Sequence, residues 1–186
     1  MKKRLWILIA IIIVLLFSLA FNIKIGSKPE AGSLEEKETV KIGVEVGSIA
    51  PDFSLYDLQG KLHSLKAVRG KKVVLLVFWA TWCSYCVDEI PELIKIHKEY
   101  SKRKVEVWGI NISEGRDKIS KFASKRRINY TILFDSEGNI ASLYKIIGIP
   151  ANIILDKKGI VRYNGELPKN YDAIFAELTG SRGKNE

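Results

Sequence analysis

A continuous apolar run at residues 73–80, VVLLVFWA, limits the folds open to this chain more than any other segment. A strand with one face in water alternates apolar and polar residues, whereas a valine-rich run that is apolar throughout is expected to be buried on both faces. Residues 105–112 (VEVWGINI) predict a second buried strand, and residues 130–134 (YTILF) predict a third strand. We therefore expect these strands to belong to a central sheet.

Hairpins and helices are predicted between and after these strands. Residues 52–65 alternate apolar and polar residues around Gln59-Gly60, which predicts a short hairpin. The turn DKKG predicts a second hairpin near the C-terminus. Helices are expected from the cysteines to about residue 101 and over residues 115–127, 139–146 and 171–178. The predicted fold class is α/β, with a central mixed sheet flanked by helices.

The N-terminus predicts a membrane anchor. Three basic residues at positions 2–4 precede an uncharged run, residues 5–21. As a helix this run spans roughly 26 Å, close to a hydrocarbon core of about 30 Å, and residues 5–23 are expected to cross the membrane once. The basic residues stay on the cytoplasmic side, so the rest of the chain is extracytoplasmic. The alternative is a cleaved signal peptide, for which Ser18 and Ala20 could supply the cleavage site.

The remaining organisation and the composition indicate one globular domain. Residues 1–23 are the predicted anchor (or signal peptide), 24–47 a mixed-charge linker, 48–180 the domain and 181–186 a tail. The composition, 47% hydrophobic and 27% charged, suits a domain with a core. The net charge is +9, but the basic residues are dispersed among acidic ones and no arginine-rich run carries aromatic residues. We therefore expect no nucleic-acid partner.

The two cysteines, Cys83 and Cys86, indicate redox chemistry. A structural disulfide normally closes a long loop, and a link across two residues restricts the unfolded chain little. Cys83 follows a buried strand and Cys86 falls in the first turn of the next helix, where unpaired N–H groups and the helix dipole stabilise a thiolate. Cys83 is then the nucleophile and Cys86 the thiol that releases the product. A zinc site needs about four ligands, and the remote His63 and His97 do not supply them, so we expect no metal and no cofactor beyond the disulfide.

The segment FWATWCSYCVDEIPEL, residues 78–93, resembles the active-site segment of thioredoxin-like proteins. It is most similar to the membrane-anchored, extracytoplasmic branch typified by ResA and TlpA. The resemblance runs from about Gly47 to Leu178 and includes GSIAPDFSLYDLQGK and GIPANIILDKKG. It implies a thioredoxin-like fold and a thiol-disulfide oxidoreductase that reduces protein disulfides. In the closest type the substrate is apocytochrome c, and electrons come from a transmembrane thiol carrier.

The resemblance also assigns site residues. Cys83 and Cys86 match the redox pair, and Pro150 matches a cis-proline that faces the disulfide. The backbone of Ile149 would then pair with an extended substrate chain. The exposed neighbours of the cysteines, Trp82 and Tyr85, are expected to touch substrate, whereas packing accounts for Trp79 and the helix kink for Pro91.

Glu89 is the candidate proton-transfer residue. Cytoplasmic thioredoxins keep an aspartate on the strand before the motif, and here that position is Val77. Glu89 lies three residues after Cys86 on the same helix face, where the ResA-type branch has a glutamate. The alternative is a solvated glutamate favoured by the helix dipole; Asp88 is interpreted as such a surface residue.

Two departures leave the direction of electron flow open. Ser84-Tyr85 stands where the closest relatives have Glu-Pro, and Ala151 replaces a frequent threonine. An oxidant that introduces disulfides into secreted proteins is therefore an alternative. A peroxiredoxin-like peroxidase is another, because APDFSL resembles the start of those enzymes, although their threonine lies three residues before the cysteine and Thr81 lies two before Cys83.

Overall fold

The computed structural model describes residues 41–180. The predicted anchor, most of the predicted linker and the tail lie outside the described residues. Within the described part of the chain, no helix combines the length and the apolar character needed to cross a membrane.

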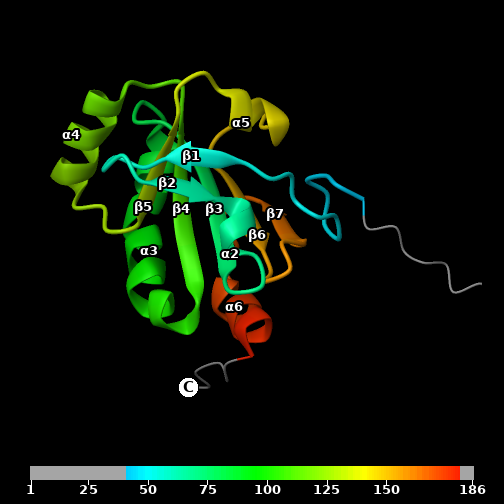
Figure 1. Cartoon of the computed structure of the whole chain (residues 1–186). Helices are drawn as coiled ribbons and strands as arrows, with labels where there is room; N and C mark the ends of the chain where they lie inside the picture. The colour runs from blue at the N-terminus through cyan, green and yellow to red at the C-terminus, as the bar shows by residue number, and fades with distance from the viewer. Residues whose placement is uncertain (1–40, 181–186) are drawn as a thin grey trace, which may run out of the picture. The chain divides into compact units, whose positions relative to one another are not determined.

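A five-stranded mixed sheet forms the centre of the domain, in the strand order β5-β4-β3-β6-β7 (Figure 1). All seven residues of the middle strand, β3, are buried, which confirms the prediction from its apolar run. β3 pairs in parallel with β4 and antiparallel with β6, and the outer pairs are parallel for β4 with β5 and antiparallel for β6 with β7. The strands are β3 (Val73–Trp79), β4 (Val105–Ile112), β5 (Thr131–Asp135), β6 (Ala151–Leu155) and β7 (Val161–Gly165).

Helices and a hairpin cover the two faces of this sheet (Figure 1). Alternate residues of β3 point to opposite faces, so Leu75 and Val77 pack in one core and Leu76 and Phe78 in the other. The first core holds α3 (Ser84–Tyr100), α4 (Arg116–Arg126) and α6 (Tyr171–Thr179). The second lies under α2 (Leu65–Val68), α5 (Asn139–Leu143) and the antiparallel hairpin of β1 (Ser54–Tyr56) and β2 (Leu62–Ser64).

The structure confirms the predicted α/β class, both hairpins, the three predicted strands and the longer helices; β3 and β4 lie inside the sheet, and β5 is an edge strand. The predicted helix at residues 139–146 is shorter than expected, because α5 ends at Leu143 and Lys145 adopts a left-handed conformation with φ of 53°. The short helix α2 and a 3₁₀ turn, η1 (Ser101–Arg103), were not predicted. Residues 41–47, assigned above to the linker, contact the domain through buried Val44 and a bond from the Gly47 N–H to the Val161 carbonyl.

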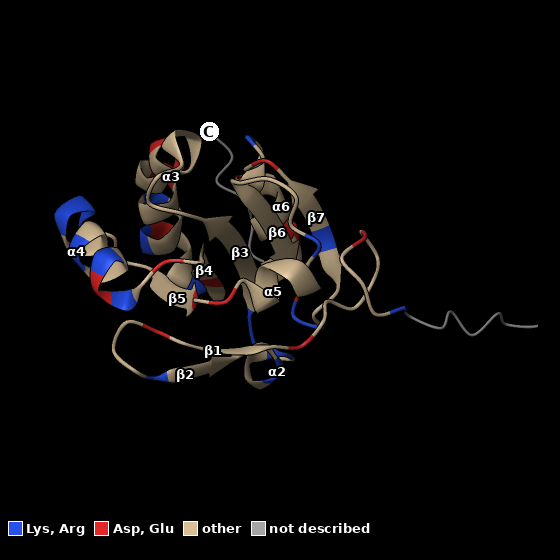
Figure 2. Cartoon of the chain, turned by 90° about the horizontal axis from the view of Figure 1, so that it is seen from above, with Lys and Arg blue, Asp and Glu red and all other residues tan. Residues whose placement is uncertain are grey.

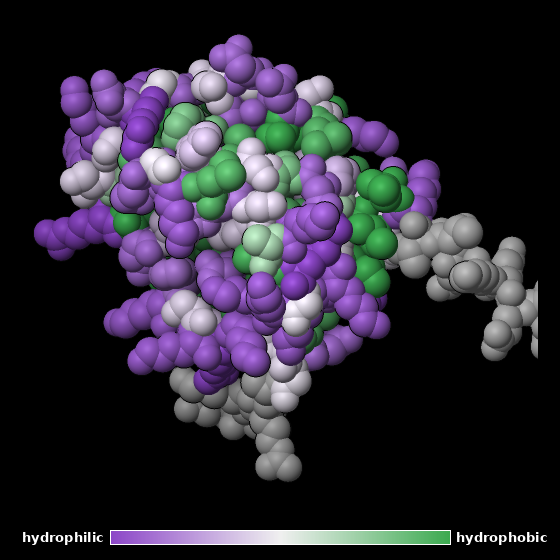
Figure 3. Space-filling view, in the orientation of Figure 1, coloured by the Kyte–Doolittle hydropathy of each residue, from purple (hydrophilic) through white to green (hydrophobic). Residues whose placement is uncertain are grey.

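The surface is mixed in charge and polarity. Figure 2 shows basic residues along α4, and acidic and basic residues at other places along the chain. On the face drawn in Figure 3, hydrophilic residues predominate below, and hydrophobic residues gather mainly over the upper part. Two exposed apolar side chains, Trp82 and Tyr85, belong to the segment that carries the two cysteines.

Candidate active site

Cys83 and Cys86 form a disulfide at the point where β3 passes into α3. β3 ends at Trp79, whose side chain is buried against Phe122 of α4. Four residues later, Cys83 caps the N-terminus of α3, and Cys86 lies in its first turn as predicted. The Cα atoms of the two cysteines are 5.3 Å apart, within the usual range for a disulfide.

The helix terminus supplies a favourable electrostatic environment for Cys83. The backbone N–H of Cys86 donates a hydrogen bond to Cys83 Sγ over 3.2 Å. The first turn of α3 contains no acidic residue, so nothing there offsets the partial positive charge of the helix terminus. A thiolate formed at Cys83 on reduction would therefore be stabilised. Cys83 is 6% exposed and Cys86 3%, so Cys83 is the sulfur nearer to solvent.

The Ile149–Pro150 peptide bond is cis, as the resemblance predicts. It lies directly before β6, and it places the carbonyl oxygen of Ile149 3.6 Å from Cys83 Sγ. A disulfide sulfur carries no proton, so this is a contact in the oxidised protein, and only the Cys83 thiol could donate a hydrogen bond here. Segments 66 residues apart thus meet at the reactive sulfur.

A groove runs beside the disulfide, along the N-terminal part of α3. Its lining includes Tyr85, Glu89, Ile147, Ile149, Pro150 and Glu166. Tyr85 is 76% exposed and Ile147 is fully exposed. Trp82, 71% exposed, stands beside Cys83 and is not part of this lining. Four of the seven predicted site residues, Tyr85, Glu89, Ile149 and Pro150, therefore line one concave surface beside the disulfide, and Trp82 adds an exposed aromatic ring next to Cys83.

Glu89 is half-buried and hydrogen-bonded on the inner side of this groove. The side-chain amide of Asn152 donates to its two carboxylate oxygens, over 3.2 and 3.5 Å. Burial raises the pKa of Glu89, hydrogen bonds from Asn152 and the Leu167 N–H oppose the rise, and the negative charge of Glu166 adds to it. The net effect is a raised pKa, which brings the carboxyl closer to the range of a thiol. This environment differs from that of a freely solvated glutamate.

Glu114 is a site residue that the sequence analysis missed. It follows β4 and is buried beside the loop that carries the cysteines. Its carboxylate accepts hydrogen bonds from the Thr81 N–H (2.7 Å), the Thr81 hydroxyl (2.6 Å) and the Asn111 amide (2.9 Å), and pairs with Lys118 (2.6 Å). Glu114 therefore fixes Thr81, two residues before Cys83. A glutamate after a strand, 33 residues from its partner, gives no local sequence signal of such a role.

The described residues provide no ligand set for a metal. Within residues 41–180, no group of three or more His, Cys, Asp or Glu side chains is arranged to hold an ion. His63, one of the two histidines considered above, instead pairs with Asp57 in the β1–β2 hairpin at 2.7 Å.

Comparison with known proteins identifies a matching family and similar sequences. Residues 46–164 match the AhpC/TSA family. Thiol-disulfide oxidoreductase ResA of Geobacillus kaustophilus (strain HTA426) is 35% identical over 161 residues, which cover 87% of this chain and 86% of the relative. Thioredoxin-like protein YneN of Bacillus subtilis (strain 168) is 38% identical over 125 residues, 66% of this chain and 72% of the relative.

A solved structure extends the similarity to the fold. The structure of a putative thiol:disulfide interchange protein DsbE from Chlorobium tepidum has a TM-score of 0.65 and 27% identity, and the match covers 75% of this chain and 99% of that protein. The disulfide of residues 83 and 86 thus lies within a domain similar to thioredoxin-like oxidoreductases in both sequence and fold.

Replacing Glu114 by glutamine should destabilise the domain in a pH-dependent way. Burial alone would raise the pKa of Glu114, but the bonds from Lys118, Thr81 and Asn111 outweigh it and lower the pKa to about 2. At neutral pH the variant should lose about 1–3 kcal/mol of unfolding free energy, because charged hydrogen bonds are removed. A lowered folded pKa stabilises the protein above the unfolded value of 4.5, and this contribution is lost as the pH falls toward 2.

Urea unfolding of the parent and Glu114→Gln at a series of pH values measures this difference. The gap between the two should be constant above about pH 5 and should shrink between about pH 4.5 and 2. Glu99→Gln, on the exposed side of α3, is the matched control and should leave stability unchanged. A gap that stays constant down to pH 2 would show that the Glu114 charge does not stabilise the loop.

Proposed function

The chain belongs to the AhpC/TSA family and is a thiol-disulfide oxidoreductase of the ResA type, and from this premise we propose that it reduces protein disulfides outside the cytoplasmic membrane. The observation that carries the proposal is the arrangement at Cys83: a helix-capping sulfur beside the Ile149 backbone, at the edge of an open groove. This arrangement suits an extended polypeptide whose own disulfide is brought to Cys83.

The backbone at Ile149 is the proposed contact for that polypeptide. β6 begins at Ala151, so Ile149 and Pro150 precede the paired part of the strand. An extended substrate segment can add to such an edge through main-chain hydrogen bonds, which depend little on the substrate's side chains. Tyr85, Ile147 and Trp82 would supply apolar contacts around the scissile disulfide.

The reaction follows from the positions of the two sulfurs. The Cys83 thiolate attacks one sulfur of the substrate disulfide, forming a mixed disulfide and releasing the other substrate sulfur as a thiolate that takes up a proton. Cys86 then loses its proton and attacks Cys83 Sγ. This step releases the second substrate thiol and forms the Cys83–Cys86 disulfide, the state present in the structure. One protein dithiol has been oxidised and one substrate disulfide reduced.

Glu89 is the proposed acceptor of the Cys86 proton. Side chains three residues apart on a helix are neighbours, about 5–6 Å apart at Cβ. Cys86 is 3% exposed, so bulk water has little access to its proton. A carboxylate with a raised pKa is a better base for a thiol than an ordinary one. Val77, on the central strand, has no group that could serve instead.

The location and partners of the protein complete the proposal. Residues 5–23 would anchor it to the membrane by a single span, with the domain outside. Because the pair must be reduced again after each turnover, an electron donor is needed, and a transmembrane thiol carrier suits this location. Apocytochrome c as the substrate and cytochrome c maturation as the process are proposed from the resemblance of the active-site segment, residues 78–93, to the ResA-type branch.

Trapping with single-cysteine variants tests the proposed reductase. Cys86→Ser should stall at the mixed disulfide, because a serine hydroxyl is not ionised at neutral pH and cannot displace sulfur. Cys83→Ser should form no such adduct, because the remaining thiol is the more deeply buried one. Oxidised peptides with the cytochrome pattern C-x-x-C-H should form the Cys86→Ser adduct faster than unrelated disulfide peptides, measured by mass spectrometry over time.

The outcomes of this trapping experiment test the reductase reaction and the identity of the preferred substrate separately. Equal rates of adduct formation for both kinds of peptide would be consistent with the reductase reaction but would contradict apocytochrome c as the preferred substrate. An adduct at Cys86 in the absence of Cys83 would overturn the assignment of the nucleophile.

Glu89→Gln tests the proton-transfer role. The substitution keeps the size of the side chain and removes its titrating group, so the resolving step should slow by about 10²-fold or more near neutral pH and lose its dependence on a carboxyl ionisation. The rate of product release from a preformed mixed disulfide, followed as a function of pH, measures this. Glu99→Gln, the same substitution at an exposed position of α3 outside the groove, is the matched control. Identical pH profiles for Glu89→Gln and the parent would make Glu89 a surface residue without a role in the reaction.

A further inference from the structure

Asn152 is a polar residue in a strand that is otherwise apolar. β6 reads ANIIL, and its other side chains belong to the two hydrophobic cores. Asn152 is 0% exposed and pairs in register with Val77, at the centre of the sheet. A valine or isoleucine would suit this position better, because a buried amide must find hydrogen-bond partners within the protein.

The side chain of Asn152 donates hydrogen bonds but accepts none from the described residues. Its Nδ2 group donates to the two oxygens of Glu89, while its Oδ1 is buried with no hydrogen-bond partner among the described residues. An unsatisfied buried acceptor costs about 1–3 kcal/mol. An asparagine kept for stability alone would not carry this cost, so the contact with Glu89 is the feature of this side chain that needs explanation.

The position of Asn152 explains how the contact arises. Alternate residues of a strand share a face, and Val77 and Ile154 show that this face is the one covered by α3. Asn152 therefore points from the sheet toward the first turns of α3, where Cys86 and Glu89 lie. It is also two residues after Pro150, so the same strand carries the proposed substrate edge and the amide that contacts Glu89.

We propose that Asn152 is the positioning residue of this site: its amide holds the Glu89 carboxylate under the first turns of α3 and favours its ionised form, ready to accept the proton of the Cys86 thiol. This inference rests on the role proposed above for Glu89. In the resolving step the proton passes from Cys86 Sγ to a Glu89 oxygen, and the Cys86 thiolate then bonds to Cys83 Sγ. Asn152 neither gains nor loses a proton.

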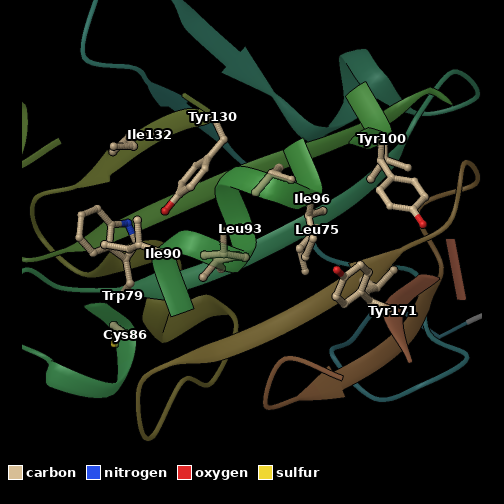
Figure 4. Close-up of a cluster of buried hydrophobic side chains, with 14 of the residues drawn as sticks. Leu75, Trp79, Cys86, Ile90, Leu93, Ile96, Tyr100, Tyr130, Ile132 and Tyr171 are labelled. Carbon is tan, nitrogen blue, oxygen red and sulfur yellow. The ribbon is translucent and has the colours of Figure 1, made fainter. Parts of the chain in front are cut away.

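The other groups around Glu89 do not replace this contact. On its own helix the neighbours are Cys86 and Asp88, and Asp88 carries the same charge as Glu89. Glu166, after β7, raises the pKa of Glu89, and only the Leu167 N–H acts in the same direction as Asn152. Tyr130, before β5, is buried, and Figure 4 shows its hydroxyl directed toward Trp79 and Ile90. Its pKa is raised by burial and by Glu89, so Tyr130 remains neutral.

Asn152→Leu tests the inference, because leucine has a similar size and cannot donate a hydrogen bond. The pKa of Glu89, followed by ¹³C NMR of the carboxyl group in the full-length reduced protein, should rise by about one unit. Between the two pKa values, release of product from the mixed disulfide should slow by up to about tenfold, because less Glu89 is ionised. An unchanged Glu89 pKa would overturn the proposal.

Matched variants make the result specific. Asn111 is also an asparagine that is 0% exposed, on the neighbouring strand β4, but its amide goes to Glu114. Asn111→Leu should therefore leave the pKa of Glu89 unchanged; an equal shift in this variant would contradict a direct role for Asn152. If Asn152→Leu does not fold, Asn152→Ser, whose side chain is too short to reach Glu89, should show the same rise.

A double variant distinguishes the two possible failures. In the Glu89→Gln background, Asn152→Leu should cause no further change in the pH profile of product release. The same shift in both backgrounds would overturn the proposal, because Asn152 would act through another group. A Glu89→Gln profile equal to that of the parent would instead overturn the proton-transfer role of Glu89, whatever the NMR titration shows.

Discussion

The burial of β3 on both faces is the constraint from which the active site follows. Helices on one side and the hairpin with α5 on the other cover this strand at the centre of the sheet, so the point where it ends is packed on both faces. Trp79, its last residue, is packed in the core, and Cys83 is reached four residues later as the cap of α3. The packed core thus places the sulfur at the N-terminus of α3, in the electrostatic field of that helix.

Residues outside the C-x-x-C segment complete the site from two other parts of the chain, the end of β4 and the start of β6. Ile149 brings a backbone carbonyl to Cys83, Glu114 holds Thr81 in the loop before it, and Asn152 reaches Glu89 from the sheet. Each contact joins segments that are more than 30 residues apart. None of these contacts involves Ser84-Tyr85, so the dipeptide can depart from the Glu-Pro of the ResA-type branch while the contacts are kept.

The sequence predicted those parts of the molecule that depend on local pattern. The apolar run of β3, the alternation around Gln59-Gly60 and the spacing of the cysteines each carry their signal within a few residues. The contacts of Glu114 and Asn152 were not predicted, because they depend on strand pairing and burial. The sequence carries one local signal for Asn152, because it is a polar residue in the apolar run ANIIL. This signal becomes informative only once the register of Asn152 with Val77 is known. The length of α5 was overestimated because a left-handed residue at Lys145 has no glycine to mark it.

The equilibrium reduction potential of the Cys83–Cys86 pair tests the account most directly. Thioredoxin has a potential of about −270 mV and a strongly oxidising disulfide oxidoreductase one of about −120 mV. A protein that donates electrons to substrate disulfides needs a low value, and titration of the full-length protein against glutathione or dithiothreitol buffers should give one below roughly −200 mV. A value of about −120 mV would contradict the reductase and indicate a protein that introduces disulfides into its partners.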